Sequence, residues 1–248
     1  MPLDFRRRYE NYIEIWDPIV YALWALRLTT LKAIKRDGIA ALTSFPKLLA
    51  EGFALWYRTL NTHFVRFENT TALPTLVGSA EGIVLELGPG LGNQLPRLNQ
   101  DKVEHIYGIE SNEFFIPELR DKVVECGLVD KYTVLAAGVE DTNVLEKSGV
   151  DYETVDTILS VQVLCSVNDP EAVAKDLYKV LKPGDYTGLW NRTWSCLIGG
   201  CNMNRDILSI LRGAGEWEGF GTLDGDEEPW SVLPRTWGTL VKPIKRFS

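Results

Sequence analysis

The feature that most constrains this chain is a glycine-rich turn that directly follows an apolar segment. Residues 84–98 read VLELGPGLGNQLPRL, with glycines at positions 88, 90 and 92. An apolar run that ends in such a turn is typical of a buried parallel strand whose backbone approaches a nucleotide without a Cβ in the way. Several cofactors are bound in this manner, so the turn predicts a nucleotide site but does not identify the nucleotide.

The chain from residue 80 onward alternates short apolar runs with helical patterns. This β-α-β-α order predicts an α/β fold with a Rossmann-like, doubly wound and mostly parallel sheet. The expected strands are residues 82–87, 105–110, 131–138 and 155–164, and the expected helices between them are Phe114–Cys126 and Pro170–Leu181.

The N-terminal part has a different texture. Apolar residues recur at helical spacing over residues 9–36 and again over about 47–66. We therefore expect an N-terminal α-helical cap at residues 1–75 and a cofactor-binding domain at residues 76–248. The cap either packs against the main domain or forms a lid over a substrate pocket, and both can hold together.

Composition narrows the partners. The net charge is −8, so the broad basic surface of a nucleic-acid-binding protein is absent and a small-molecule partner is favoured. The four cysteines form no CxxC pair and there are only two histidines, which argues against a metal site and favours a reducing, cytoplasmic compartment. The apolar stretch at 18–26 is too short to span a bilayer, although a helix lying on a membrane surface stays open.

The residues around the turn discriminate between cofactors. The dinucleotide pattern GxGxxG would require glycine at position 93, where this chain has Asn93. Glu86 would repel a pyrophosphate but suits a cationic ligand such as the amino group of S-adenosylmethionine (SAM). Glu110 ends the second expected strand and can accept hydrogen bonds from ribose hydroxyls. The acid and small residues of GVED, 138–141, commonly frame an adenine.

Taken in order, these segments resemble the class I SAM-dependent methyltransferases over residues 80–184. VLELGPGLGNQLPRL looks like their first motif, IYGIESN like the ribose motif, and VQVLCSVNDPEAVAKDLYKVLKPGD like the fourth strand with its helix and turn. Within that class the chain is similar to the methyltransferase-like 7 group and its fungal small-molecule relatives. That group includes thiol S-methyltransferases, and some of its members are membrane-associated.

The resemblance implies SAM as the cofactor and assigns a set of binding residues. Catalytic residues stay unassigned, because SAM carries an already electrophilic methyl group and the protein mainly aligns the acceptor. His63 lies in the cap, His105 begins a strand, and Cys165 is expected to be buried filler. The implied cofactor-binding residues are Glu86, Gly88, Pro89, Gly90, Gly92, Asn93, Glu110, Ser111, Gly138, Val139, Glu140, Val161 and Gln162.

One region departs from the family pattern. After LKPG the only candidate for a fifth strand is YTGLW, 186–190, which contains a glycine, so we expect this strand to be shortened. A stunted strand would leave an edge for a second chain, hence a possible homodimer, and would remodel the acceptor pocket.

Two functions follow. The first is methyl transfer to a small, apolar molecule through a thiol, hydroxyl or amine. The second is binding of SAM or its product without transfer, as in assisted cyclisation or rearrangement of a metabolite, or as a binding partner. A nicotinamide oxidoreductase is disfavoured by Asn93 and Glu86. The expected location is cytoplasmic, with possible membrane contact through the N-terminal helices.

Overall fold

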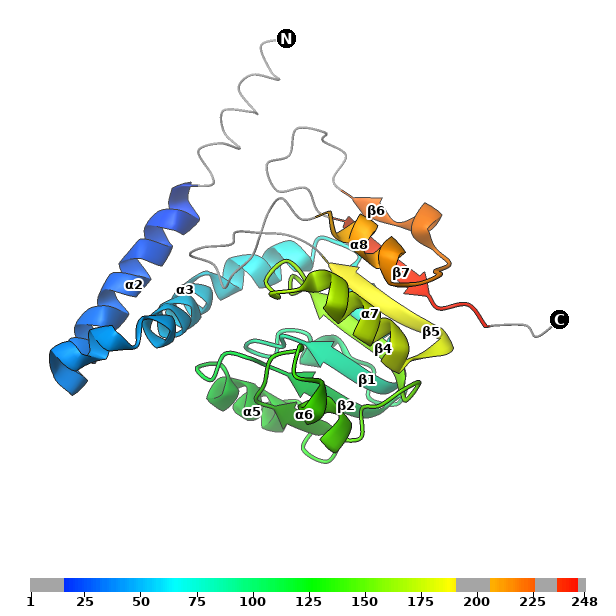
Figure 1. The fold of residues 1–248 in the computed structure, drawn as a ribbon, viewed down its shortest axis with the longest axis horizontal. Helices are drawn as coiled ribbons and strands as arrows, with labels where there is room; N and C mark the ends of the chain where they lie inside the picture. The colour runs from blue at the N-terminus through cyan, green and yellow to red at the C-terminus, as the bar shows by residue number, and fades with distance from the viewer. Residues whose placement is uncertain (1–15, 191–205, 226–235, 245–248) are drawn as a thin grey trace, which may run out of the picture.

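The computed structural model describes residues 16–190, 206–225 and 236–244. Within these residues the chain forms a seven-stranded sheet of order β3-β2-β1-β4-β5-β7-β6 (Figure 1). β1 to β5 pair in parallel, and β7 pairs antiparallel with both β5 and β6. The strands are β1 Gly82–Leu87, β2 Val103–Ile109, β3 Tyr132–Leu135, β4 Val155–Val161, β5 Leu181–Trp190, β6 Asp224–Gly225 and β7 Thr236–Val241.

Helices cover both faces of the sheet, as the alternating pattern predicts. Leu85 and Leu87 of β1 point to a core shared with α6, α7 and α8, whereas Val84 points to a second core shared with α4 and α5. The expected Rossmann-like fold is thereby confirmed. These helices are α4 Leu73–Gly78, α5 Ile116–Glu125, α6 Thr142–Lys147, α7 Pro170–Val180 and α8 Ile207–Ala214, with short 3₁₀ turns η2 Leu95–Arg97 and η3 Phe220–Thr222.

The two N-terminal helices form a hairpin. α2 (Trp16–Asp37) and α3 (Phe45–Glu68) are joined by the 3₁₀ turn η1 (Gly38–Thr43). They run antiparallel, since Trp56 Nε1 donates to the carbonyl oxygen of Pro18 at 2.8 Å while Gly52 approaches Leu26. Figure 1 shows that η1 lies at the far end of the hairpin, away from the sheet. The helical cap is present as expected, and residues 1–15 of it lie outside the described residues.

The fifth strand corrects the sequence analysis. β5 is ten residues long and pairs with β4 and with β7. Tyr186 to Trp190 lie opposite Thr157 to Val161, so the weak YTGLW segment is itself the strand. Val155 pairs with Leu181 and Thr157 pairs with Tyr186, so β5 has four residues where β4 has one. This register shift accommodates the KPGD segment. The expectation of a shortened fifth strand was wrong, because pairing on both sides outweighs the poor strand propensity of Gly188.

Candidate functional site

The glycine turn lies where the order of the sheet reverses. β1 is between β2 and β4, and the turn leaves its C-terminal end, the place where ligands bind in open α/β sheets. Gly88, Gly90 and Gly92 all have positive φ, between +55° and +74°. At Gly88 a Cβ would lie 2.8 Å from Val163 Cγ2, just past the end of β4. Both the backbone conformation and the lack of space therefore require glycine at position 88.

Glu110 ties the turn to the end of β2. One carboxylate oxygen accepts from the backbone N–H of Gly90 and the other from the backbone N–H of Asn112, each at 2.8 Å. The side chain is buried, which raises its pKa, while these backbone donors oppose the rise. Each carboxylate oxygen can accept two hydrogen bonds, so Glu110 keeps acceptor capacity for a ligand.

Glu86 forms a second buried acidic group beneath the turn. Its Oε2 accepts from the Tyr132 hydroxyl at 2.8 Å, and its Oε1 has no hydrogen-bond partner among the described residues. Burial raises the pKa of Glu86 to about 7; the Tyr132 hydrogen bond lowers it, and the nearby charge of Glu110 raises it further. A buried carboxylate with an unused oxygen is suited to a cationic donor.

Tyr132 reaches Glu86 from two strands away because of a glycine between them. Tyr132 is on β3, Glu86 is on β1, and Gly108 lies opposite Glu86 on the intervening β2. A Cβ at Gly108 would lie 1.9 Å from the Tyr132 hydroxyl oxygen. The phenol therefore crosses β2 only where that strand has no side chain.

Helix α3 contacts the residue that follows the glycine turn, Asn93. Asn93 Nδ2 donates to the Tyr57 hydroxyl at 3.2 Å and to Asn61 Oδ1 at 2.7 Å. Asn112 Nδ2 donates to the carbonyl oxygen of Ala50 at 3.0 Å. Burial, followed by the charge of Glu68, raises the pKa of Tyr57. The cap thus contributes side chains to the candidate site.

Sequence reasoning missed Tyr57 and Asn61. Their spacing of four residues puts both side chains on one face of α3. That spacing does not predict their contacts with Asn93, which lies 36 residues after Tyr57 and 32 after Asn61. The C-terminal end of α3 is fixed independently by a buried ion pair between Glu68 and Arg97, 2.7 Å apart. The position of α3 over the turn therefore has two anchors.

Four further predicted residues lie in the turn or next to the ends of β2 and β4. Pro89 is buried and Ser111 is exposed, both beside the turn or the end of β2. Val161 ends β4, and Gln162 follows it with a φ of +59°, a conformation that side-chain-bearing residues rarely adopt and that often marks functional sites.

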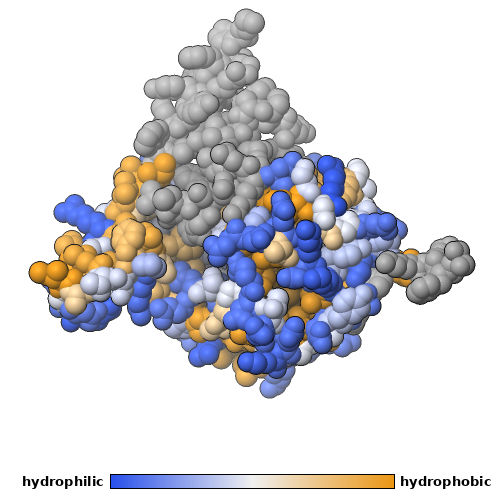
Figure 2. Space-filling view, in the orientation of Figure 1, coloured by the Kyte–Doolittle hydropathy of each residue, from blue (hydrophilic) through white to orange (hydrophobic). Residues whose placement is uncertain are grey.

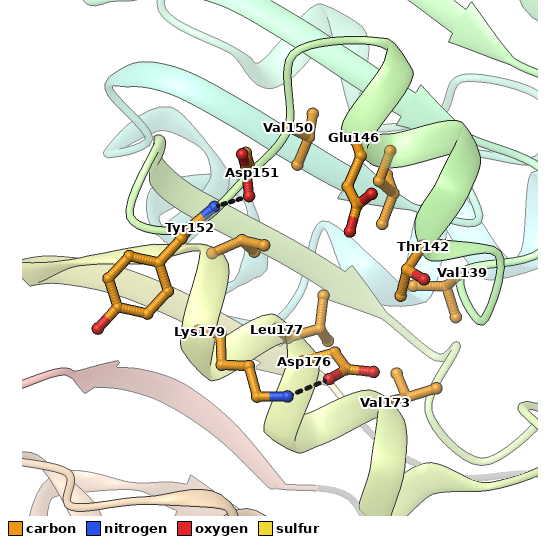
Figure 3. Close-up of a pocket in the computed structure, with 12 residues that line it drawn as sticks. Val139, Thr142, Glu146, Val150, Asp151, Tyr152, Val173, Asp176, Leu177 and Lys179 are labelled. Carbon is orange, nitrogen blue, oxygen red and sulfur yellow. Dashed lines mark hydrogen bonds and ion pairs between the residues drawn. The ribbon is translucent and has the colours of Figure 1, made fainter.

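The segment after β3 is engaged differently. Glu140 Oε1 accepts from the backbone N–H of Asn168 at 2.9 Å, which links the loop after β3 to the loop after β4. A Cβ at Gly138 would lie 2.9 Å from Glu140 Oε2. Val139 packs against the core and lines a cavity of about 360 Å³ between α6 and α7, where Glu146 and Asp176 project from facing helices (Figure 3). Asp176 is paired with Lys179 at 2.8 Å, and this cavity is separate from the glycine turn.

Among the described residues, both histidines and Cys165 lie outside the glycine turn. Cys165 is buried, as expected for filler. His63 is exposed on α3, and His105 Nε2 lies 2.9 Å from Thr133 Oγ1 within the sheet. In the part of the chain that the structure describes, no cluster of histidine, cysteine, aspartate or glutamate could hold a metal ion.

Comparison with known proteins gives consistent matches. A family model described as "Methyltransferase domain" matches residues 85–187. "Sterol methyltransferase-like 1" of Botryococcus braunii is 25% identical over 168 residues, which are 63% of this chain and 41% of that protein. The chain therefore spans about two fifths of the length of the curated relatives it matches.

Two solved structures have a similar fold. The CurJ carbon methyltransferase matches 96% of this chain and 71% of its own, with a TM-score of 0.57 and 14% identity. The [4+2]-cyclase SpnF matches 70% of this chain and 81% of its own, with a TM-score of 0.54 and 17% identity. At these identities the likeness shows the fold alone.

Proposed function

We propose that this chain, which carries a class I SAM-dependent methyltransferase domain, transfers the methyl group of SAM to a small, apolar molecule. The observation that carries the proposal is the pair of buried carboxylates, Glu86 and Glu110, at the glycine turn. Two buried acids that influence each other favour a cation over an anion. SAM bears a sulfonium and an ammonium group, whereas a nicotinamide dinucleotide would bring a pyrophosphate to the same place.

The residues at the turn fit SAM group by group. The unused Oε1 of Glu86 would accept a hydrogen bond from the ammonium group, directly or through water. Glu110 would accept from the ribose hydroxyls with its remaining lone pairs. The positive φ of Gly88 and Gly90 gives the turn the sharp bend whose backbone would face the cofactor.

Further residues complete the proposed cofactor site. We assign the adenine side to the loop after β3 and the ribose end of β2, and the acceptor side to the end of β4. Asn93, held by Tyr57 and Asn61, would couple the cap to the bound cofactor. The proposed members beyond the turn are Ser111, Gly138, Val139, Glu140, Val161 and Gln162, and the proposed division of the chain is a cap at 1–75 and a cofactor-binding domain at 76–248.

The chemistry places few demands on this protein. SAM supplies an electrophilic methyl group, so the main task of the side chains is to hold the acceptor in line and exclude water. Both histidines among the described residues lie in other roles, exposed on α3 or bonded to Thr133. A site poor in bases favours an acceptor that ionises easily, such as a thiol, over an alcohol. The name of the algal relative adds sterols to the classes worth testing.

Binding without transfer is the second candidate. We retain this second candidate because the chain has a fold similar to that of the [4+2]-cyclase SpnF, and one fold can host both kinds of reaction. The sequence feature that favoured this alternative was a stunted fifth strand, whereas residues 186–190 of β5 pair with β4 on one side and β7 on the other. Methyl transfer is therefore the better-supported function. We propose small molecules rather than nucleic acid as its substrates, given the net charge of −8.

Incubation with methyl-labelled SAM tests the proposal. We expect label to pass to at least one member of a panel of apolar thiols, phenols, amines and sterols, and we expect the Glu110→Ala variant to transfer far less at the same subsaturating SAM concentration. SAM binding with no transfer to any acceptor would favour the second candidate. Loss of label from SAM that is equal for wild type and Glu110→Ala would contradict an enzymatic origin.

A further inference from the structure

The helical hairpin presents large apolar side chains to solvent. Ile39 in η1 is 78% exposed, and other large apolar side chains on α2, in η1 and at the start of α3 are about half exposed. Figure 2 shows orange, apolar residues over much of the projecting end of the molecule. Large apolar side chains gathered on one exposed surface mark a region that another molecule covers. These side chains are Val20, Tyr21, Leu23, Trp24, Leu31, Ile39, Leu42 and Phe45.

The face of α2 turned toward α3 carries small side chains instead. Ala22, Ala25, Thr29 and Ala33 are buried there. A Cβ at Gly52 of α3 would lie 3.2 Å from Leu26 Cα, so the two backbones approach closely. On α2, small residues face α3, which contributes the buried Trp56, and large apolar residues face outward. This arrangement on α2 is the reverse of that on a helix whose outer face is in water.

The residues around the tip of the hairpin carry a local positive charge. Residues 27–47 contain five basic residues and one acidic residue, a local charge of +4 in a chain whose total is −8. Lys32, Lys35, Arg36 and Lys47 are all exposed. Arg36 is paired with the one acid, Asp37, at 2.8 Å, and Lys47 with Glu113 at 3.2 Å. The other three basic residues, Arg27, Lys32 and Lys35, are exposed on α2. We call the basic residues of 27–47 the basic collar. Together with the apolar tip beside it, the basic collar complements an anionic lipid surface.

We propose that the α2–η1–α3 hairpin docks on the surface of an anionic bilayer, with Ile39, Leu42 and Phe45 inserted at the headgroup boundary. In the described part of the chain no helix is long and apolar enough to cross a membrane. A second copy of the chain is a poorer occupant, because two equivalent tips would bring their basic collars together. The proposal is independent of the chemistry at the glycine turn.

Vesicle flotation of the full chain tests this docking. We expect the chain to float with phosphatidylcholine vesicles that contain about one third phosphatidylserine, less with phosphatidylcholine alone, and less at high salt. The Ile39→Ser, Leu42→Ser, Phe45→Ser triple variant should lose binding by about ten-fold or more. The Lys32→Gln, Lys35→Gln variant should lose about five-fold per charge removed.

A matched control is available on the sheet domain. Val124, Val129 and Tyr152 are exposed to a similar degree and lie far from the hairpin in sequence. Their replacement by serine should leave flotation unchanged, and SAM binding by each variant reports that its fold is kept. The proposal is overturned if wild type fails to float with anionic vesicles, or if the tip and control variants bind equally. A self-association that the tip variant abolishes, without any vesicle binding, would assign the surface to a second copy instead.

Discussion

Replacing Glu110 by alanine is expected to weaken SAM binding by about 100-fold, or about 3 kcal/mol. The carboxylate accepts from the backbone N–H groups of Gly90 and Asn112 and is the proposed acceptor for the ribose. Hydrogen bonds to a charged group contribute about 1.5–3 kcal/mol each, and their loss leaves buried donors unpaired. The substitution therefore removes the ribose acceptor and loosens the glycine turn together.

Calorimetric titration of SAM measures this loss. Glu125→Ala is the matched control, because Glu125 is an exposed acid on α5 that pairs with Lys122, and its removal should leave the affinity unchanged. Glu110→Gln separates charge from size: the amide can accept through one oxygen alone, so we expect a loss between wild type and alanine. Unchanged affinity in Glu110→Ala would refute the ribose assignment.

The second large effect is expected at Gly108. An alanine there would put its Cβ 1.9 Å from the Tyr132 hydroxyl and 2.5 Å from the ring carbon that carries it. The phenol has little freedom to move, because it is buried and donates to Glu86. We expect Gly108→Ala to lower the free energy of unfolding by about 3 kcal/mol or more, from overpacking and from the lost hydrogen bond to Glu86.

Urea denaturation with Gly213→Ala as control tests this steric argument. Gly213 is inside α8, and a Cβ there meets nothing within 4 Å. Its replacement should be neutral or stabilise by up to about 1 kcal/mol, because alanine is the better helix former. Equal stability of Gly108→Ala and wild type would mean that Tyr132 does not cross β2 as described.

The local pattern was sufficient to predict β1 to β4, because each is a short, mostly apolar segment that alternates with helical patterns along the chain. The end of β4 was less predictable: the apolar run continues to Leu164, but the strand stops at Val161 where Gln162 takes a positive φ. The fifth strand was misjudged for the opposite reason, since its stability comes from two neighbours and not from its own residues.

The candidate site was predictable only where it is local in sequence. The glycine turn and Glu110 follow directly from the ends of β1 and β2. The Tyr132 hydroxyl donates a hydrogen bond to Glu86, 46 residues away, and Asn61 accepts one from Asn93, 32 residues away. Such pairs depend on strand order and helix docking, which no local pattern encodes. The proposed roles of Gly138 and Glu140 stay predictions.

The pH dependence of binding follows from Glu86. Its pKa is raised to about 7, so below that value most molecules carry the neutral acid, which cannot attract an ammonium group. SAM affinity should therefore rise as the pH rises toward 7, while the ammonium group of SAM stays protonated. Tyr132, through its hydrogen bond, and Glu110, through its charge, are the titratable groups that shift the pKa of Glu86. Burial raises the pKa of both groups. Ionisation of Glu110 with rising pH therefore also favours SAM binding. Glu86→Gln should weaken this dependence.

The most direct test of the SAM site is one calorimetric experiment in which wild-type protein is titrated with SAM at about pH 5.5 and about pH 7 and with NAD at about pH 7. We expect SAM to bind at both values, about ten-fold more tightly at the higher pH, and NAD to give no binding heat. Binding of NAD, or failure of SAM to bind at either pH, would contradict the assignment of the glycine turn to SAM.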